Sequence, residues 1–112
     1  MADTTILDRL AAVIRQRQSE GGPESYVATL LQRGLPKVRS KVQEEAGEVI
    51  EASVRAELGG AKAALVHEAA DLVFHLWVLL AAHEVPAEDV WEELERRFGT
   101  GGLEEKARRH RD

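Results

Sequence analysis

Apolar residues recur every three or four positions along almost the whole chain, in stretches separated by short segments that contain Gly or Pro. This spacing places apolar side chains on one face of an α-helix, whereas a strand would require strict alternation. Leu10, Val13 and Ile14 illustrate the spacing in the first stretch. No segment alternates as a strand does, and the chain contains no repeat or low-complexity segment. The pattern therefore predicts an all-α protein.

Glycines, prolines and capping residues divide the chain into five predicted helices, which form a bundle. Thr4 or Thr5 is expected to cap the first helix, which ends before Gly21. The other four are expected from Ser25 to Gly34, from Pro36 to Gly59, over about 61–83, and from Pro86 to Gly99. Gly34 is expected to end the second helix in a left-handed C-cap. Pro36 suits the first turn of the third helix because its fixed backbone angle is already helical.

Length, charge and composition limit the classes of function. The 112 residues suit one domain, with residues 1–98 as the helical body and 99–112 as its charged C-terminal tail. A formal charge of −5 argues against nucleic-acid binding, which usually needs a basic face. The absence of Cys excludes a disulfide framework, a thiolate nucleophile and a Cys-based metal site.

No targeting segment or membrane span is expected. Asp8 and Arg9 interrupt the apolar residues near the N-terminus before a signal-peptide core can form. The most apolar stretch, 72–82, contains His75 and is shorter than the roughly 20 residues that a spanning helix needs. A soluble protein of the cytoplasm is therefore expected.

The predicted third helix carries acidic residues within its apolar face. The inward face is expected to comprise Val38, Val42, Ala46, Val49, Ala52 and Ser53. At about 100° per residue, Glu45 falls inside this face and Glu48 lies at its edge beside Lys41, whereas Glu44 points further out. A carboxylate in an apolar face is unfavourable unless another group compensates its charge.

The predicted fourth helix repeats this pattern. It is apolar nearly all round from residue 72 to 82, and a narrow polar stripe of Glu68, Asp71 and His75 runs between its apolar faces. Two packed helices would thus direct four carboxylates into one interior, which requires a cation. Mg²⁺ or Mn²⁺ is expected, since both prefer oxygen ligands. The alternative is that these acids form ordinary solvated faces, and His75 is expected to be a hydrogen-bonded core residue rather than a ligand.

The two apolar faces of the fourth helix also bear on assembly. A small domain buries a limited share of its surface, so a second copy would help to cover them. Phe74, Trp77 and Val78 are candidates for the interface of a homodimer in which both chains build a four-helix core. The alternative is that the first and fifth helices cover this face within one chain.

The spacing of the acidic pairs resembles that of a known superfamily. EExxE at 44–48, followed after 19 residues by ExxD at 68–71, is similar to the MazG-like all-α nucleoside triphosphate pyrophosphohydrolases. Nearly the whole chain resembles one family within it, the phosphoribosyl-ATP pyrophosphatases. The supporting segments are SYVATLLQRG, KVQEEAGEVIEA, HEAADLVFHLWVLL and GLEEKARR. Two positions depart from the family pattern: Gln43 stands where Gly is expected, and Phe74 where Tyr is common.

This resemblance implies a particular enzyme. It would hydrolyse phosphoribosyl-ATP to phosphoribosyl-AMP and pyrophosphate in histidine biosynthesis, as a homodimer. The magnesium ligands would be Glu45, Glu48, Glu68 and Asp71. Glu44 or Glu48 would orient or deprotonate the attacking water.

The substrate phosphates would need cationic partners. The candidates are Lys41, Lys37 and, in the tail, Lys106 and Arg109. The alternative is that these are ordinary surface charges and a frayed terminus. Two other functions stay open: a house-cleaning pyrophosphatase acting on dCTP, dUTP or damaged nucleotides through the same metal centre, and a helical dimerisation module whose acids merely keep it in solution.

Overall fold

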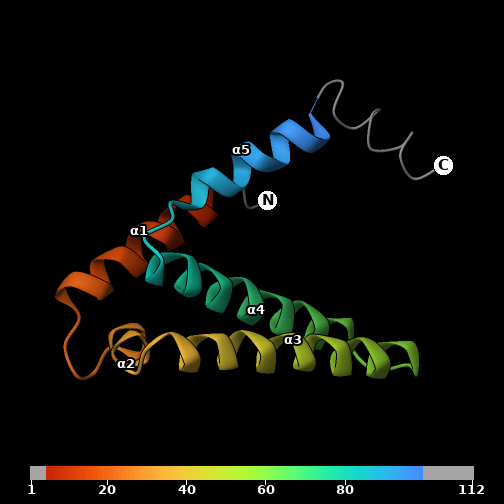
Figure 1. Ribbon diagram of the computed structural model, residues 1–112. Coiled ribbons are helices and arrows are strands. Elements are labelled where there is room, and N and C mark those ends of the chain that lie inside the picture. The colour runs from red at the N-terminus through yellow and green to blue at the C-terminus, as the bar shows by residue number, and fades with distance from the viewer. Residues whose placement is uncertain (1–4, 100–112) are drawn as a thin grey trace.

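A computed structural model describes residues 5–99, which form five α-helices with short connections (Figure 1). The helices are α1 (Thr5–Glu20), α2 (Tyr26–Gln32), α3 (Leu35–Glu57), α4 (Lys62–Ala82) and α5 (Ala87–Phe98). No strand occurs within residues 5–99. The all-α prediction with five helices is confirmed. Thr4, one of the two predicted caps, and most of the predicted tail lie outside the described residues.

The antiparallel pair of α3 and α4 is the centre of the fold (Figure 1). A tight turn joins the two helices, and Gly59 in this turn has a φ of +97°, a conformation that residues with a Cβ rarely adopt. α1 packs against the C-terminal end of α4, and α5 packs against α1 and extends away from the pair (Figure 1). One long stretch of α3 therefore faces α4 alone, which leaves room for a site between them.

The ends of the helices largely follow the prediction. Ser25 caps α2, since its Oγ accepts a hydrogen bond from the Ala28 N–H at 3.1 Å. Pro36 lies in the first turn of α3, as expected. The prediction for Gly34 is wrong in detail: its φ is +93°, but its ψ of 169° is extended, and it serves as the N-cap of α3. The reason is that α3 begins immediately after α2, so this residue must reverse the chain rather than continue a turn.

The core lies where α1, α2, α3 and α4 meet. Ile14, Val38 and Val78 are fully buried there. Trp77 is also buried; its indole N–H donates to the Leu7 carbonyl oxygen at 3.1 Å, and its ring lies 5.4 Å from that of Trp91. Trp77 is therefore covered by α1 and α5, and Val78 is buried within the same chain, so the prediction that these two residues form a subunit interface is wrong. Phe74, the third candidate, is half-buried, and its place in an interface stays a prediction.

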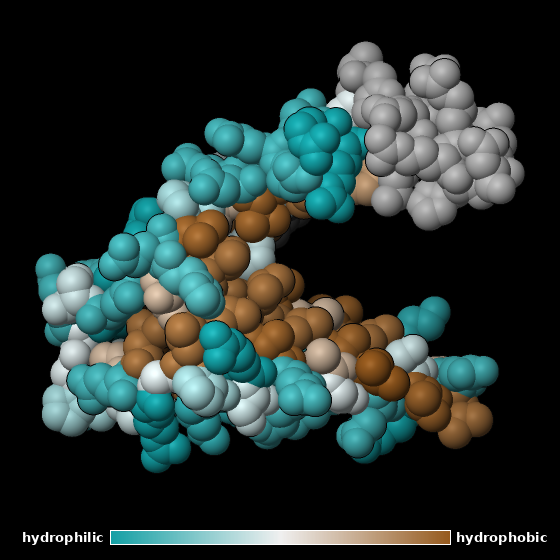
Figure 2. All heavy atoms as spheres, in the orientation of Figure 1, coloured by the Kyte–Doolittle hydropathy of each residue, from teal (hydrophilic) through white to brown (hydrophobic). Residues whose placement is uncertain are grey.

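A second apolar surface is exposed. It includes large side chains of α3, α4 and α5, namely Ile50, Val54, Leu58, Val66, Leu76, Leu94 and Phe98. Figure 2 shows apolar side chains along the hollow between α5 and the α3–α4 pair. Ser53, predicted on the inward face of α3, is exposed, because it follows the buried Ala52 by one position and so points about 100° away from it.

By length and composition, α4 meets the criteria for a helix that crosses a membrane. The prediction of no membrane span considered only residues 72–82. The apolar stretch of α4 is longer than this and has a mean hydropathy of 1.5. A core helix of a soluble protein meets the same criteria, so one such helix is weak evidence for a span. Its acidic residues instead connect α4 with the site described next.

Candidate metal centre

The packing of α3 on α4 brings three of the four predicted ligands together. Glu45 and Glu48 come from neighbouring turns of α3, and Glu68 comes from α4. One carboxylate oxygen of each lies within 4.8 Å of the others. The spacing of three residues on α3 places both of its side chains on the side that meets α4. These three residues are the carboxylate cluster.

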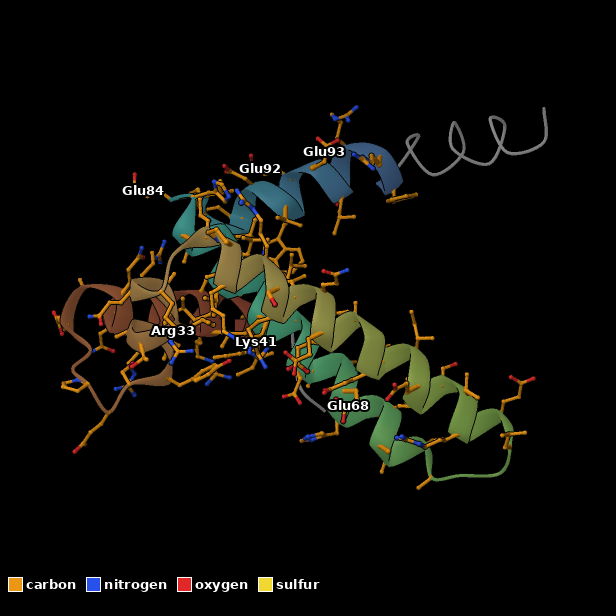
Figure 3. The ribbon with its side chains drawn as sticks, turned by 60° about the horizontal axis from the view of Figure 1, so that its bottom comes forward. Arg33, Lys41, Glu68, Glu84, Glu92 and Glu93 are labelled. Atoms are coloured by element: carbon orange, nitrogen blue, oxygen red, sulfur yellow. The ribbon has the colours of Figure 1, made fainter. Side chains whose placement is uncertain are left out.

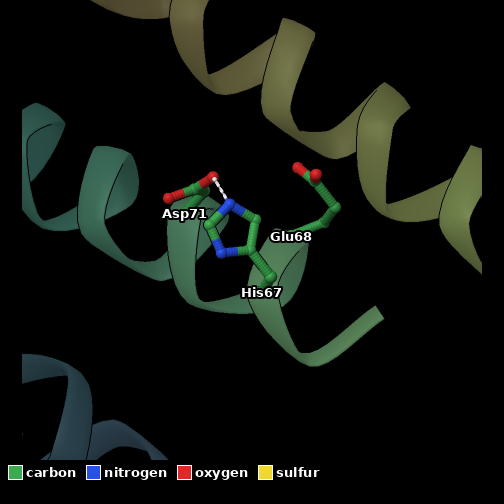
Figure 4. A group of neighbouring side chains, drawn as sticks. All are labelled: His67, Glu68 and Asp71. Carbon is green, nitrogen blue, oxygen red and sulfur yellow. Dashed lines mark ion pairs between the residues drawn. The ribbon is translucent and has the colours of Figure 1, made fainter. Parts of the chain in front are cut away.

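Asp71 lies at the edge of this cluster rather than within it. It forms a second group with His67 and Glu68, and suitable ligand atoms of these three also lie within 4.8 Å of one another (Figure 4). The exposed His67 places its Nε2 3.4 Å from Oδ2 of Asp71. Glu68 belongs to both groups, so the four predicted ligands are contiguous, with Glu68 between the α3 pair and Asp71.

Two carboxylate oxygens of the cluster lack a partner. Glu45 is 6% exposed, and its Oε2 is buried without a hydrogen-bond donor among residues 5–99. Oε2 of Glu68 is in the same situation within this described part of the chain. An unpaired buried carboxylate oxygen is costly, and a cation removes that cost. Hard divalent cations take such oxygen ligands, so the residues present fit a metal ion of this kind.

The pKa of Glu48 reflects the negative charge that gathers in the cluster. Its hydrogen bonds with Glu45 and Glu68, together with their negative charge, raise the pKa of its carboxyl group to about 7. Carboxylates so close together cannot all ionise at neutral pH without a counter-charge. A divalent cation would supply that charge and compete with the proton.

Lys41 supplies part of the missing positive charge. Its Nζ lies 3.3 Å from Oε2 of Glu44 and 3.4 Å from Oε1 of Glu45. Burial lowers the pKa of Lys41, but hydrogen bonds to these two carboxylates outweigh that effect and raise it above its usual value. Figure 3 shows Lys41 of α3 on the same side of the helix pair as Glu68 of α4. Glu44 itself is exposed, as predicted.

Of the other three predicted phosphate-binding residues, the structure describes only Lys37. Lys37 lies on α3 one turn before Lys41 and is half-buried. Lys106 and Arg109 lie outside the described residues. The phosphate-binding roles of these residues stay predictions.

Two residues behind the cluster extend the site. His75 is 6% exposed and makes two hydrogen bonds, which confirms its prediction as a hydrogen-bonded core residue. One of these hydrogen bonds is to Tyr26 at the start of α2. No role was predicted for Tyr26 from the sequence. The available signal was its place directly after the N-cap Ser25, within the segment SYVATLLQRG that carried the family resemblance.

The fold and the site together define a class: an all-α protein in which two packed helices present carboxylates able to hold a metal ion. The family model for phosphoribosyl-ATP pyrophosphohydrolase matches residues 7–98. The chain belongs to this family.

Similar proteins of this family share close to half of their residues with the chain. A protein of Trichlorobacter lovleyi is 49% identical over 104 residues, which cover 93% of each chain. One of Novosphingobium aromaticivorans is 50% identical over 93% of this chain and 94% of its own. One of Geobacter metallireducens is 42% identical over 96% and 94%, respectively. All three are named phosphoribosyl-ATP pyrophosphatase.

Proposed function

We propose that this protein hydrolyses phosphoribosyl-ATP to phosphoribosyl-AMP and pyrophosphate in histidine biosynthesis, with Mg²⁺ as its cofactor and in the cytoplasm. The observation that carries the proposal is the carboxylate cluster between α3 and α4, with two buried oxygens that lack donors within residues 5–99. Family membership and the names of relatives supply the substrate. Mn²⁺ is an acceptable substitute because it shares the preference for oxygen ligands.

The reaction breaks the anhydride bond between the α- and β-phosphates and adds one water molecule across it. Glu45, Glu48, Glu68 and Asp71 would hold the ion. When bound, the ion supplies Lewis-acid polarisation of the phosphate oxygens and offsets their charge against the carboxylates. Without such an ion, the negative cluster would repel a triphosphate. The chain's own residues must still orient the water and receive its proton.

Glu44 and Glu48 are the two candidates for that proton. Glu48 is also a proposed metal ligand, and a bound cation would displace its proton, so the pKa of about 7 that its carboxyl group has without a metal ion does not by itself make it the base. Glu44 is exposed and already accepts a hydrogen bond from Lys41, so it lies at the rim where water is available. The variants Glu44→Gln and Glu48→Gln separate them: if Glu44 is the base, Glu44→Gln should lose the acidic limb of the pH–rate profile and keep its affinity for Mg²⁺, whereas Glu48→Gln should weaken Mg²⁺ binding in either case.

Cationic side chains would hold the phosphates. Lys41 stands at the edge of the cluster with its ammonium on Glu44 and Glu45, so a small side-chain movement would direct it to a phosphate oxygen. Lys37 would lie one turn behind it. Lys106 and Arg109 would approach from the tail and act on the same phosphates.

A homodimer is part of the proposal. The exposed apolar residues of α3 and α4, together with the apolar hollow in Figure 2, form a surface that a second copy would cover. Two α3–α4 pairs packed together would build a four-helix core. Sedimentation equilibrium tests this: wild type should have twice the chain mass, and Leu76→Lys should shift it toward the monomer. A monomeric wild type at micromolar concentration would contradict it.

The function is tested by pyrophosphate release from phosphoribosyl-ATP and from a panel of free nucleoside triphosphates, with and without Mg²⁺. We expect turnover of phosphoribosyl-ATP that depends on Mg²⁺. Turnover of dCTP, dUTP or damaged nucleotides instead would keep the metal centre and change the function to house-cleaning. No turnover, with no thermal stabilisation by Mg²⁺, would favour a helical dimerisation module.

A further inference from the structure

Tyr26 and His75 form a hydrogen-bonded pair directly behind the carboxylate cluster. Nδ1 of His75 lies 2.8 Å from the carbonyl oxygen of Asp71, one turn earlier on α4. Nε2 of the same ring lies 2.8 Å from the Tyr26 hydroxyl oxygen. The ring therefore connects the first turn of α2 with the turn of α4 that ends at Asp71.

The partners define the roles of the two ring nitrogens of His75 when the ring is neutral. A carbonyl oxygen can only accept, so Nδ1 of His75 carries a proton and donates it to Asp71. In the neutral ring Nε2 is then an acceptor, and the Tyr26 hydroxyl donates to it. Burial, reinforced by Glu45 against the opposing charge of Lys41, raises the pKa of Tyr26, so the hydroxyl keeps its proton. The Asp71 carbonyl thus sets the tautomer, and the Tyr26 hydroxyl holds the ring in one orientation.

The same ring borders the buried ligand of α3. Nδ1 of His75 lies 4.0 Å from Oε1 of Glu45, and both side chains are more than nine-tenths buried. Edge-on contacts with Tyr26 and Phe74, at centroid distances of 5.7 and 5.1 Å, fill the remaining sides of the ring. A rotation of His75 would break two hydrogen bonds and change the space available to Glu45.

We propose that Tyr26 is a positioning residue of the metal centre, which acts through His75 on Glu45 and on the α4 turn between Glu68 and Asp71. The inference rests on the proposed function for the identity of the centre. Metal ligands need support of this kind because coordination tolerates only small displacements of the ligand atoms. The ring of Tyr26 is half exposed, so its hydroxyl, rather than its apolar surface, provides the buried contact.

The test removes only the hydroxyl, in Tyr26→Phe. Calorimetric titration with Mg²⁺, and Mn²⁺ binding followed by electron paramagnetic resonance, should show a dissociation constant raised about tenfold, as for other outer partners of metal ligands. Pyrophosphate release from phosphoribosyl-ATP should recover at high Mg²⁺. A merely structural role would lower the melting temperature of the metal-free protein and leave the metal affinity of the folded protein unchanged.

Thr29→Val is the matched control. Thr29 also carries a hydroxyl on α2, but this hydroxyl donates to the Pro23 carbonyl oxygen at 3.5 Å and is exposed. Its removal should leave the Mg²⁺ dissociation constant within twofold of wild type. A tenfold loss of affinity in this control would overturn the proposal, because any disturbance of α2 would then be sufficient.

A spectroscopic measurement follows the ring itself. Imidazole ¹⁵N spectra of the wild type should show Nδ1 of His75 protonated and Nε2 as a hydrogen-bonded acceptor. In Tyr26→Phe, the Nε2 resonance should move toward that of an acceptor without a donor, and an unmoved resonance would overturn the inference. Equal metal affinity of wild type and Tyr26→Phe would also overturn it. A wild type that binds no divalent ion would instead overturn the proposed function.

Discussion

Glu48 on α3 and Glu93 on α5 are the same residue type in the same chain, yet their pKa values shift in opposite directions. Hydrogen bonds from Arg96 and Arg97 lower the pKa of Glu93 to about 2. Hydrogen bonding with Glu45 and Glu68, and their negative charge, raises that of Glu48 to about 7. The first carboxylate is surrounded by donors with positive charge, and the second by groups that repel it.

The two glutamates mark two kinds of region. In the balanced region, around Glu93 on α5, neighbouring arginines neutralise the carboxylate. In the unbalanced region, the carboxylate cluster, a cation from outside the chain would have to do so. The partners of Glu93 lie three and four residues later on the same helix, where they meet without help from tertiary packing. The carboxylate cluster draws residues of one sign from two helices, and Lys41 is bound to only one of its three members. The uncompensated charge is thus a feature of the α3–α4 interface, and this is where the ion is proposed to bind.

The largest expected effect comes from removing a ligand charge. Glu45→Gln should lower pyrophosphate release from phosphoribosyl-ATP by at least about 100-fold at saturating Mg²⁺, because metal-assisted catalysis contributes several kcal/mol. Steady-state rates measure this. Glu93→Gln is the control from the balanced region and should stay within about twofold of wild type. Comparable losses of activity in both variants would show that the reaction depends no more on the carboxylate cluster than on Glu93.

Mg²⁺ should stabilise the folded protein by binding to the carboxylate cluster, which is the unbalanced region. At a free concentration of Mg²⁺ about 100 times its dissociation constant, the folded state gains about 2.7 kcal/mol, which raises the melting temperature by about 10–20 °C in a domain of this size. Thermal melts with and without Mg²⁺ test this. Glu93→Gln should show the same increase, and Glu68→Gln should lose most of it. An increase unaffected by Glu68→Gln would place the ion elsewhere.

The two glutamates should give the metal-free protein opposite pH dependences. Because the folded pKa of Glu48 lies above the ordinary value of 4.5, the folded state binds more protons, so this group's contribution to stability declines as pH rises from about 4.5 to 7. Because the folded pKa of Glu93 lies below 4.5, its contribution is present above that pH and is lost as pH falls toward 2.

Denaturant titrations over this pH range measure both slopes in the absence of divalent ions. Glu48→Gln should flatten the decline toward neutral pH without changing the acidic end. Glu93→Gln should do the reverse. If the two variants altered the same part of the profile, the difference between the regions would be contradicted. Both side chains are near solvent, so high salt should weaken both effects.

The smallest expected effect concerns the support of α2. Ser25→Ala removes the cap that accepts from the Ala28 N–H and should cost about 1 kcal/mol of unfolding free energy. Chemical denaturation measures the loss. The pKa of Glu48 and the affinity for Mg²⁺ should stay close to wild type, since this cap touches neither helix of the cluster. A large loss of metal affinity would show that the cap of α2, and not only the Tyr26 hydroxyl, supports the centre.

Local features of the sequence determined the helices and the sides of the helices on which the acids lie. The spacing of apolar residues, with Ser25, Pro36 and the glycine pairs as boundaries, defined five elements, because helix periodicity and capping depend on residues a few positions apart. The same reasoning placed Glu45 inside the apolar face and Glu44 outside it. The acidic motifs indicated the superfamily, and the segments SYVATLLQRG and GLEEKARR favoured the family within it.

Only the tertiary structure decided which side chains meet. Packing, and not periodicity, grouped Glu45 and Glu48 of α3 with Glu68 of α4. It also covered Trp77 with α1 and α5 within one chain, and it joined Tyr26 to His75 across 49 residues. Such contacts depend on the register and crossing of helices that are distant in sequence, and these are set by the whole core rather than by any one helix.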